Sequence, residues 1–228
     1  MSSRTDRVNR SPTDGSVVID LPVVVAFVPA VMAVVVSPGP DSIYTVTRSL
    51  SEGRAAGVAA AVGTATGVLV HAGAAVLGLS ALLRTTAEAY VLMKYVGAAY
   101  LVYLGVRLLR DDETFEIDEP VESGDGSLLD SYRKALTINV TNPQVAVFVL
   151  AFFPQFVPAT ADAALQLSVL GAVYAGLSLA YLAAVALFAD RVRHLLLDSA
   201  TGQRAVRYAS GSVLIGFGLK LALDEGRI

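Results

Sequence analysis

The chain has 228 residues, of which 54% are apolar and only 16% are charged, and its net charge is −3. A soluble domain normally carries about a quarter charged residues, so the composition argues against a soluble fold. The negative net charge argues against a nucleic-acid-binding surface, and the absence of cysteine excludes disulfides and thiolate metal sites.

Residues 1–16 are polar, and we expect them to form a disordered tail. After this tail, six apolar runs reach the roughly 20 residues that a helix needs to cross a membrane. The runs are Val17–Thr47, Ala56–Leu83, Ala87–Leu109, Ala135–Val157, Ala164–Ala189 and Val206–Leu223. The first run is too long for a signal-peptide core, so we treat it as a retained helix. The sequence predicts an all-α, multi-pass protein of the cell membrane with six transmembrane helices.

Lysine and arginine are concentrated in the connections after the first, third and fifth runs, whereas the connections after the second and fourth contain only Arg84. Basic loops remain in the cytoplasm, so this distribution predicts a cytoplasmic acidic loop at Asp111–Asp125 and both termini outside. Arg4, Arg7 and Arg10 in the N-terminal tail favour the opposite orientation.

The two halves of the chain resemble each other. The stretch from Lys94 matches the stretch from Arg207 without gaps, and this alignment pairs Gly105 with Gly218. We therefore expect a first repeat at 17–109, an acidic linker at 110–134 and a second repeat at 135–228. Three helices per repeat is an odd number, so the second repeat would be inverted in the membrane, as in many transporters. The alternative is chance similarity among apolar helices.

Prolines interrupt the first and fourth predicted helices. Pro38 and Pro40 in Ser37-Pro-Gly-Pro-Asp41 cannot both lie inside an unbroken helix. Pro40 is expected to begin a new half-helix, and Pro143 to begin another with Asn142 as its cap. Such helix starts attract anionic groups such as a substrate carboxylate. The predicted substrate-binding residues are Pro38, Gly39, Pro40, Asp41, Asn139, Asn142 and Pro143. The alternative is a pair of ordinary proline kinks.

Two titratable residues are candidates for ion coupling. Asp41 follows the first break, and a carboxylate inside a membrane is costly unless it has a function, such as binding an ammonium group or carrying a proton. It could instead complete the cap of its own half-helix. His71 shares a helix face with Gly63 and Gly67, a small-residue pattern that directs it toward the helix bundle. A satisfied core histidine is the alternative, and Asn139 could bond within the bundle or contact substrate.

These segments together resemble the lysine-exporter (LysE-type) superfamily, in particular its homoserine/threonine-efflux branch. The similarity rests on seven segments: Ser37–Asp41, Arg48–Gly57, Gly67–His71, Gly78–Leu83, Lys94–Gly105, Asn139–Pro143 and Phe152–Phe156. Members often have a polar residue where this chain has Val68 and a lysine where it has Gln144. Both changes reduce the polarity that the family would place near the transport path.

The resemblance implies proton-driven export of amino acids or close derivatives, without a cofactor. An amino acid, protons and the lipid bilayer are therefore the expected partners, and a homo-oligomer is among the assemblies that the sequence allows. A divalent-metal exporter needs more ligands than one buried Asp and one His provide. A structural membrane protein would not explain the paired breaks. An enzyme would need a nucleophile and base that no motif supplies, so we assign no catalytic or metal-binding residue.

Overall fold

The structure, a computed structural model, describes residues 21–37, 39–82, 87–110, 127–157, 163–194 and 199–223. All regular secondary structure in these residues is helical, which agrees with the predicted fold class. The N-terminal tail 1–16, Pro38 and the acidic loop Asp111–Asp125 lie outside the described residues.

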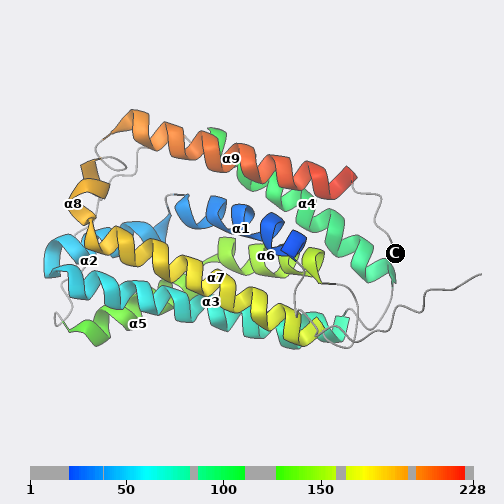
Figure 1. Cartoon of the computed structure of the whole chain (residues 1–228), viewed down its shortest axis with the longest axis horizontal. Coiled ribbons are helices and arrows are strands. Elements are labelled where there is room, and N and C mark those ends of the chain that lie inside the picture. The colour runs from blue at the N-terminus through cyan, green and yellow to red at the C-terminus, as the bar shows by residue number, and fades with distance from the viewer. Residues whose placement is uncertain are drawn as a thin grey trace, which may run out of the picture.

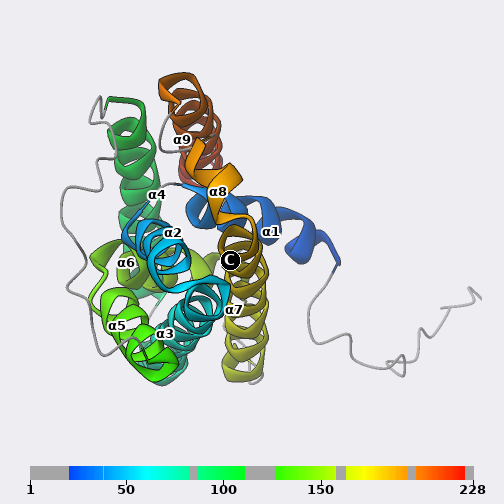
Figure 2. The same ribbon diagram turned by 90° about the vertical axis from the view of Figure 1, so that its left-hand side faces the viewer.

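The helices run lengthwise between the two ends of the molecule (Figure 1). In chain order they are α1 (Leu21–Val36), α2 (Pro40–Glu52), α3 (Arg54–Leu82), α4 (Ala87–Arg110), α5 (Leu128–Val140), α6 (Pro143–Phe152), the 3₁₀ helix η1 (Phe153–Phe156), α7 (Ala163–Leu187), α8 (Ala189–Val192) and α9 (Ala200–Leu223). Seen from one end, α4 and α9 lie together on one side of the bundle, and α3, α5 and α7 lie on the other (Figure 2). The two sides therefore enclose the segments around the breaks, where the candidate site lies.

Both predicted helix breaks are confirmed. The pair α1 and α2 bends by 57° and the pair α5 and α6 bends by 56°, each across a short non-helical segment. Gly39 is extended before Pro40, and Asn142 is extended before Pro143. Because proline has no amide hydrogen to donate, it can begin a helix without losing a hydrogen bond, and it blocks the preceding helix from continuing.

Two predicted helix starts are wrong. The fourth span begins at Leu128 instead of Ala135, and the sixth begins at Ala200 instead of Val206. Both helices open with turns that contain polar side chains, Asp130 in α5 and Thr201 and Gln203 in α9, so these turns lie outside the apolar runs. A side chain caps each start: the Ser127 hydroxyl accepts from the Asp130 amide, and the Ser199 hydroxyl accepts from the Gly202 amide. Such caps satisfy amides that the helix itself leaves unpaired, so the polar turns are stable outside the membrane core.

Within the described ranges, three single helices are long and apolar enough to span a membrane: Arg54–Gly78, Ala163–Leu187 and Ala200–Leu223. Counting each bent pair as one further span gives up to five by length and composition. Helix α4 packs along α9, with which it makes extensive contact. It carries three cations, Lys94, Arg107 and Arg110. The described part of the chain is therefore all-helical, with several helices able to cross a membrane.

Candidate functional site

Asp41 lies in the first turn of α2, directly after the first break. Pro40 is the first helical residue, and among the described residues no side chain caps this helix start. The expectation that Asp41 could complete the cap of its own half-helix is wrong, because its carboxylate bonds instead to side chains of other elements. Asp41 is therefore directed across the bundle and away from its own helix start.

The Asp41 carboxylate joins three elements. Its Oδ1 and Oδ2 accept from Asn139 Nδ2 at 3.2 and 3.3 Å, and Oδ2 accepts from Asn142 Nδ2 at 3.4 Å. The Thr64 hydroxyl of α3 donates to Oδ1 at 3.3 Å. Hydrogen bonds to a carboxylate are stronger than neutral ones, so these contacts hold the two breaks and α3 together. The sequence alone did not indicate Thr64, since a threonine inside an apolar helix carries no distinctive pattern.

Asn142 connects the second break to Asp41. Its side-chain oxygen accepts from the Gln144 amide at 2.9 Å, which confirms the predicted cap on the helix that begins at Pro143. Its side-chain nitrogen is the donor to Asp41. Both ends of one amide group are therefore used, one for the local helix start and one for the first half of the chain.

Asn139, at the end of α5, contacts both coupling candidates. Its side chain bonds to Asp41, and its backbone oxygen lies 3.1 Å from Nε2 of the half-buried His71. His71 therefore faces the bundle, as predicted. Gly67 makes this approach possible, because a Cβ there would lie 2.5 Å from Asn139 Oδ1. Asn139 is 1% exposed, and its Oδ1 has no hydrogen-bond partner within the described part of the chain.

A cavity of about 40 Å³ lies beside Asp41. The segments at both breaks line it together with α3 and α7, and its polar lining comprises Ser37, Asp41, Ser42, Thr64, Asn139, Asn142, Gln144, Tyr174 and Ser178. Gly39 and Pro40 also line it. Val68 and Gln144, the two residues that depart from the family pattern, both reach this cavity. The volume holds a few water molecules at most, so it is too small for a larger solute in this conformation.

The chemistry of the site is that of one carboxylate among neutral donors and acceptors. Asp41 is the single charged residue among the described residues that line the cavity. No group of three or more His, Asp or Glu side chains that could hold a metal occurs within the described ranges. Such a site can bind an ammonium group or a proton at the carboxylate. Pro143 supports the lining from the helix start, whereas Pro38 lies outside the described residues.

Comparisons with known proteins agree with these features. The family model "LysE type translocator" matches residues 32–225. An uncharacterized membrane protein of Pseudomonas aeruginosa is 32% identical over 86% of this chain and 93% of its own length. The homoserine/homoserine lactone efflux protein of Salmonella typhimurium is 28% identical over 82% and 89%, and the leucine efflux protein of Salmonella choleraesuis is 27% identical over 83% and 89%. No solved structure matches.

Proposed function

Because the chain belongs to the LysE-type translocator family, a family of transporters and not of enzymes, we propose that it exports amino acids or close derivatives by secondary active transport. The relatives named as efflux proteins for homoserine, its lactone and leucine support this substrate class. The observation that carries the proposal is the position of Asp41, whose carboxylate lies in a cavity between two helix breaks and bonds to both.

The substrate binds with its ammonium group at Asp41. The first turn of α2 supplies a site for the carboxylate, since no side chain of the described residues caps it and Asp41 and Ser42 of this turn line the cavity. Helix starts attract anions, so a carboxylate can bind there while Pro40 and Gly39 fix the backbone. The Asn142 oxygen already occupies the Gln144 amide at the α6 start. Asn139, Asn142 and Pro143 therefore position Asp41 and the second wall of the site.

Export is driven by protons that replace the substrate at Asp41. An unpaired carboxylate within a membrane costs about 2.5–3.5 kcal/mol on insertion scales, so it favours carrying either a cation or a proton across. Exchange of the two ligands at one carboxylate couples outward substrate movement to inward proton movement. His71 is the second candidate for coupling, because the Asn139 residue that bonds its ring also bonds Asp41.

Symmetric helix contacts support six spans in two inverted repeats. A Cβ on Gly105 of α4 would lie 2.6 Å from the Gly211 oxygen of α9, and one on Gly218 would lie 2.8 Å from the Ala98 oxygen. The alignment that pairs Gly105 with Gly218 also pairs Ala98 with Gly211. Exchanging the two helices therefore converts one contact into the other. This is the behaviour of an antiparallel pair related by a two-fold axis, with α4 as the sixth span.

A second helix pair, α3 and α7, behaves in the same way. Gly57 lies against Ala186, and Gly171 lies against Ala72. The separation in sequence between Gly57 and Gly171 equals that between Ala72 and Ala186. Exchanging α3 and α7 therefore converts one contact into the other. The cavity residues Thr64 and Ser178 have this separation too. The symmetry axis therefore passes near the cavity, where inverted-repeat transporters bind their substrates.

The experiment that tests the proposal is efflux from cells loaded with a panel of labelled amino acids and carboxyl-modified derivatives. Cells with the protein are expected to lose at least one compound faster than cells without it, and collapse of the proton gradient should remove the difference. Equal efflux of every compound in both strains would contradict the proposed function. A panel that includes divalent metals would separate the metal-exporter alternative.

A further inference from the structure

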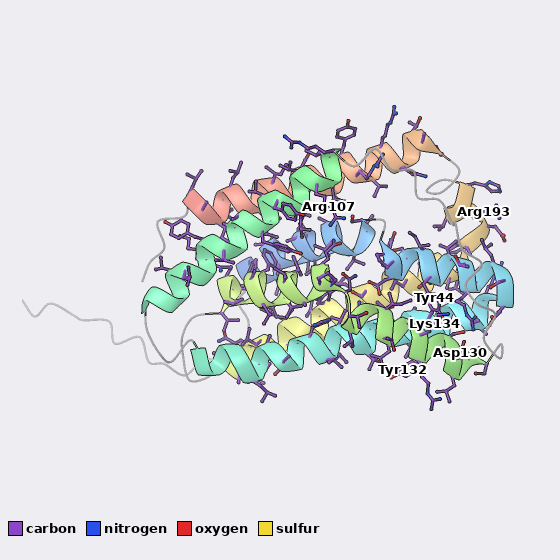
Figure 3. All side chains as sticks on the ribbon, turned by 180° about the vertical axis from the view of Figure 1, so that it is seen from behind. Tyr44, Arg107, Asp130, Tyr132, Lys134 and Arg193 are labelled. Atoms are coloured by element: carbon purple, nitrogen blue, oxygen red, sulfur yellow. The ribbon has the colours of Figure 1, made fainter. Side chains whose placement is uncertain are left out.

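A buried charge cluster joins α2 to α5 at a distance from the Asp41 cavity. Its centre is Arg48, which is 1% exposed. Arg48 Nε and Nη2 donate to the Ser131 hydroxyl at 3.0 and 2.8 Å, and Nη2 forms an ion pair with Asp130 at 3.3 Å. Nη1 forms a second ion pair with Glu52, one turn further along α2. The same guanidinium lies over the Tyr44 ring, which is labelled near Asp130 in Figure 3.

The cluster and the site lie along one antiparallel helix pair. Asp41 at the start of α2 meets Asn139 at the end of α5, and Arg48 further along α2 meets Ser131 near the start of α5. Arg48 follows Asp41 by about two helical turns on the same helix face, a rise of roughly 10 Å. The two half-helices thus close over one side of the cavity, and Arg48 fastens them at the end away from it.

Beyond the breaks, on the side away from α2 and α5, the helices meet through aromatic rings. There α1 and α6, the other halves of the same two broken helices, meet through Phe27 and Phe152, whose stacked centroids are 5.9 Å apart. Phe27 also packs edge-on against Phe153 and Phe156 at 5.4 and 5.3 Å. The two broken helices therefore contact each other through charges between α2 and α5, and through aromatic rings between α1 and α6.

We propose that the Arg48–Ser131–Asp130 cluster is the gate on the α2–α5 side of the transport path, and that it opens when α2 separates from α5. This inference rests on the proposed transport function. In the structure the cavity beside Asp41 is too small for an amino acid. Substrate can reach Asp41 from this side only if α2 and α5 move apart.

Buried charges suit a contact that must break repeatedly. A buried ion pair adds little net stability, because its attraction is largely offset by the loss of hydration that each group suffers. When the helices separate, water solvates Arg48 and Asp130 and recovers that hydration. Asp130 is already 34% exposed, so water can enter the cluster from its side. The aromatic contact between α1 and α6 gains no such hydration. Separating the helices on the two sides therefore requires different free energies.

The test measures access to the cavity without relying on transport. The chain contains no cysteine, so Ser178→Cys places a single thiol in the cavity lining. An impermeant charged thiol reagent is added to either face of vesicles that contain the purified full-length protein. Adding Arg48→Gln to Ser178→Cys should raise the labelling rate several-fold from the α2–α5 face and leave it unchanged or lower from the other face. Equal acceleration from both faces, or from neither, would overturn the gate.

Milder variants keep the test valid if Arg48→Gln does not fold. Ser131→Ala removes one hydroxyl from the cluster, and Arg48→Lys keeps the charge but loses the two-point contact with Ser131. Both are expected to give intermediate labelling rates from the α2–α5 face. Unchanged rates in both, in protein that elutes as a single folded species, would equally contradict the gate.

A cross-link distinguishes a moving gate from a fixed contact. Tyr44 of α2 and Ala135 of α5 pack in one small apolar cluster beside Arg48. In the otherwise cysteine-free chain, the pair Tyr44→Cys and Ala135→Cys should transport in its reduced form and stop when a short bifunctional thiol reagent joins the helices. Each single-cysteine variant treated with the same reagent is the control. Undiminished transport after complete cross-linking would overturn the gate, whereas loss of transport in the reduced form of every variant would instead count against the proposed function.

Discussion

The carboxylate of Asp41 accepts two hydrogen bonds from the Asn139 side chain, at 3.2 and 3.3 Å, and so links the two broken helices across the centre of the bundle. The two residues come from opposite halves of the chain. A change of charge at Asp41 therefore acts on both breaks together. This relationship makes Asp41 suited to couple binding to movement, because each ligand that it accepts alters the contact between the halves.

Gly67 should determine whether Asn139 can reach Asp41. Gly67→Ala places a Cβ 2.5 Å from Asn139 Oδ1, and the resulting overpacking is expected to cost about 1–3 kcal/mol of stability and to reduce transport strongly. Gly73→Ala on the same helix is the matched control, since nothing lies within 4 Å of its added Cβ. Thermal unfolding in detergent and initial transport rates measure the two effects. Equal behaviour of the two variants would show that Gly67 does not position Asn139.

The Asn142 side chain should contribute to transport beyond its role as a helix cap. Asn142→Ala is expected to cost about 0.5–2 kcal/mol as a lost cap and also to remove a donor to Asp41. Ser199→Ala removes a comparable cap from α9 and serves as the control. Both variants should lose similar stability, but only Asn142→Ala should lose transport at normal abundance.

Pro40→Ala and Pro143→Ala should also lose transport, because their helices could then continue through the breaks. Wild-type flux in all three break variants would reduce the breaks to structural kinks.

The proposed two-fold axis predicts paired effects on the α4–α9 contact. Gly105→Ala and Gly218→Ala each press a methyl group against a backbone oxygen of the facing helix, at 2.6 and 2.8 Å, and should lower the unfolding temperature by similar amounts. Gly216→Ala on α9 meets nothing within 4 Å and should leave the temperature unchanged or raise it. A large loss in only one of the two contact variants would speak against the symmetric arrangement.

The orientation can be tested with reporter fusions. A reporter inserted in the Asp111–Asp125 loop should give a cytoplasmic signal, and one fused to the C-terminus should give an external signal, because lysine and arginine gather in the loops of one face. The reversed pattern would show that the N-terminal arginines determine the orientation. Fusions that report the same side at both positions would imply an even number of spans between them. The inverted repeat requires an odd number there, so this result would contradict it.

The breaks could be predicted from sequence because their cause is local. Proline lacks an amide hydrogen wherever it occurs, so Pro40 and Pro143 identify the ends of half-helices without knowledge of the packing. The start of α5 could not be found in this way, since the residues after Ser127 form no long apolar run and the helix start depends on a side-chain cap. Helix ends outside the membrane core follow capping and not hydropathy.

The partners of Asp41 depend on packing between distant segments. Asn139 and Asn142 were suspected because they lie at the second break, but Thr64 and Ser178 became site residues only once α3 and α7 were brought beside it. Arg48 was interpreted as a charge that sets orientation and as part of a segment that resembles the family. Its spacing of about two turns from Asp41, on the same face of α2, was a signal that it also faces the bundle.

The most direct test is substrate counterflow and proton-driven uphill transport by purified Asp41→Asn protein in vesicles. This substitution keeps the size of the side chain and removes its charge. Asp190→Asn, at an exposed position of α8, is the matched control and should behave as wild type. If Asp41 binds substrate and proton in turn, the folded Asp41→Asn protein should show neither activity, and retained counterflow without uphill transport would restrict Asp41 to the proton. Full uphill transport by Asp41→Asn would contradict the account.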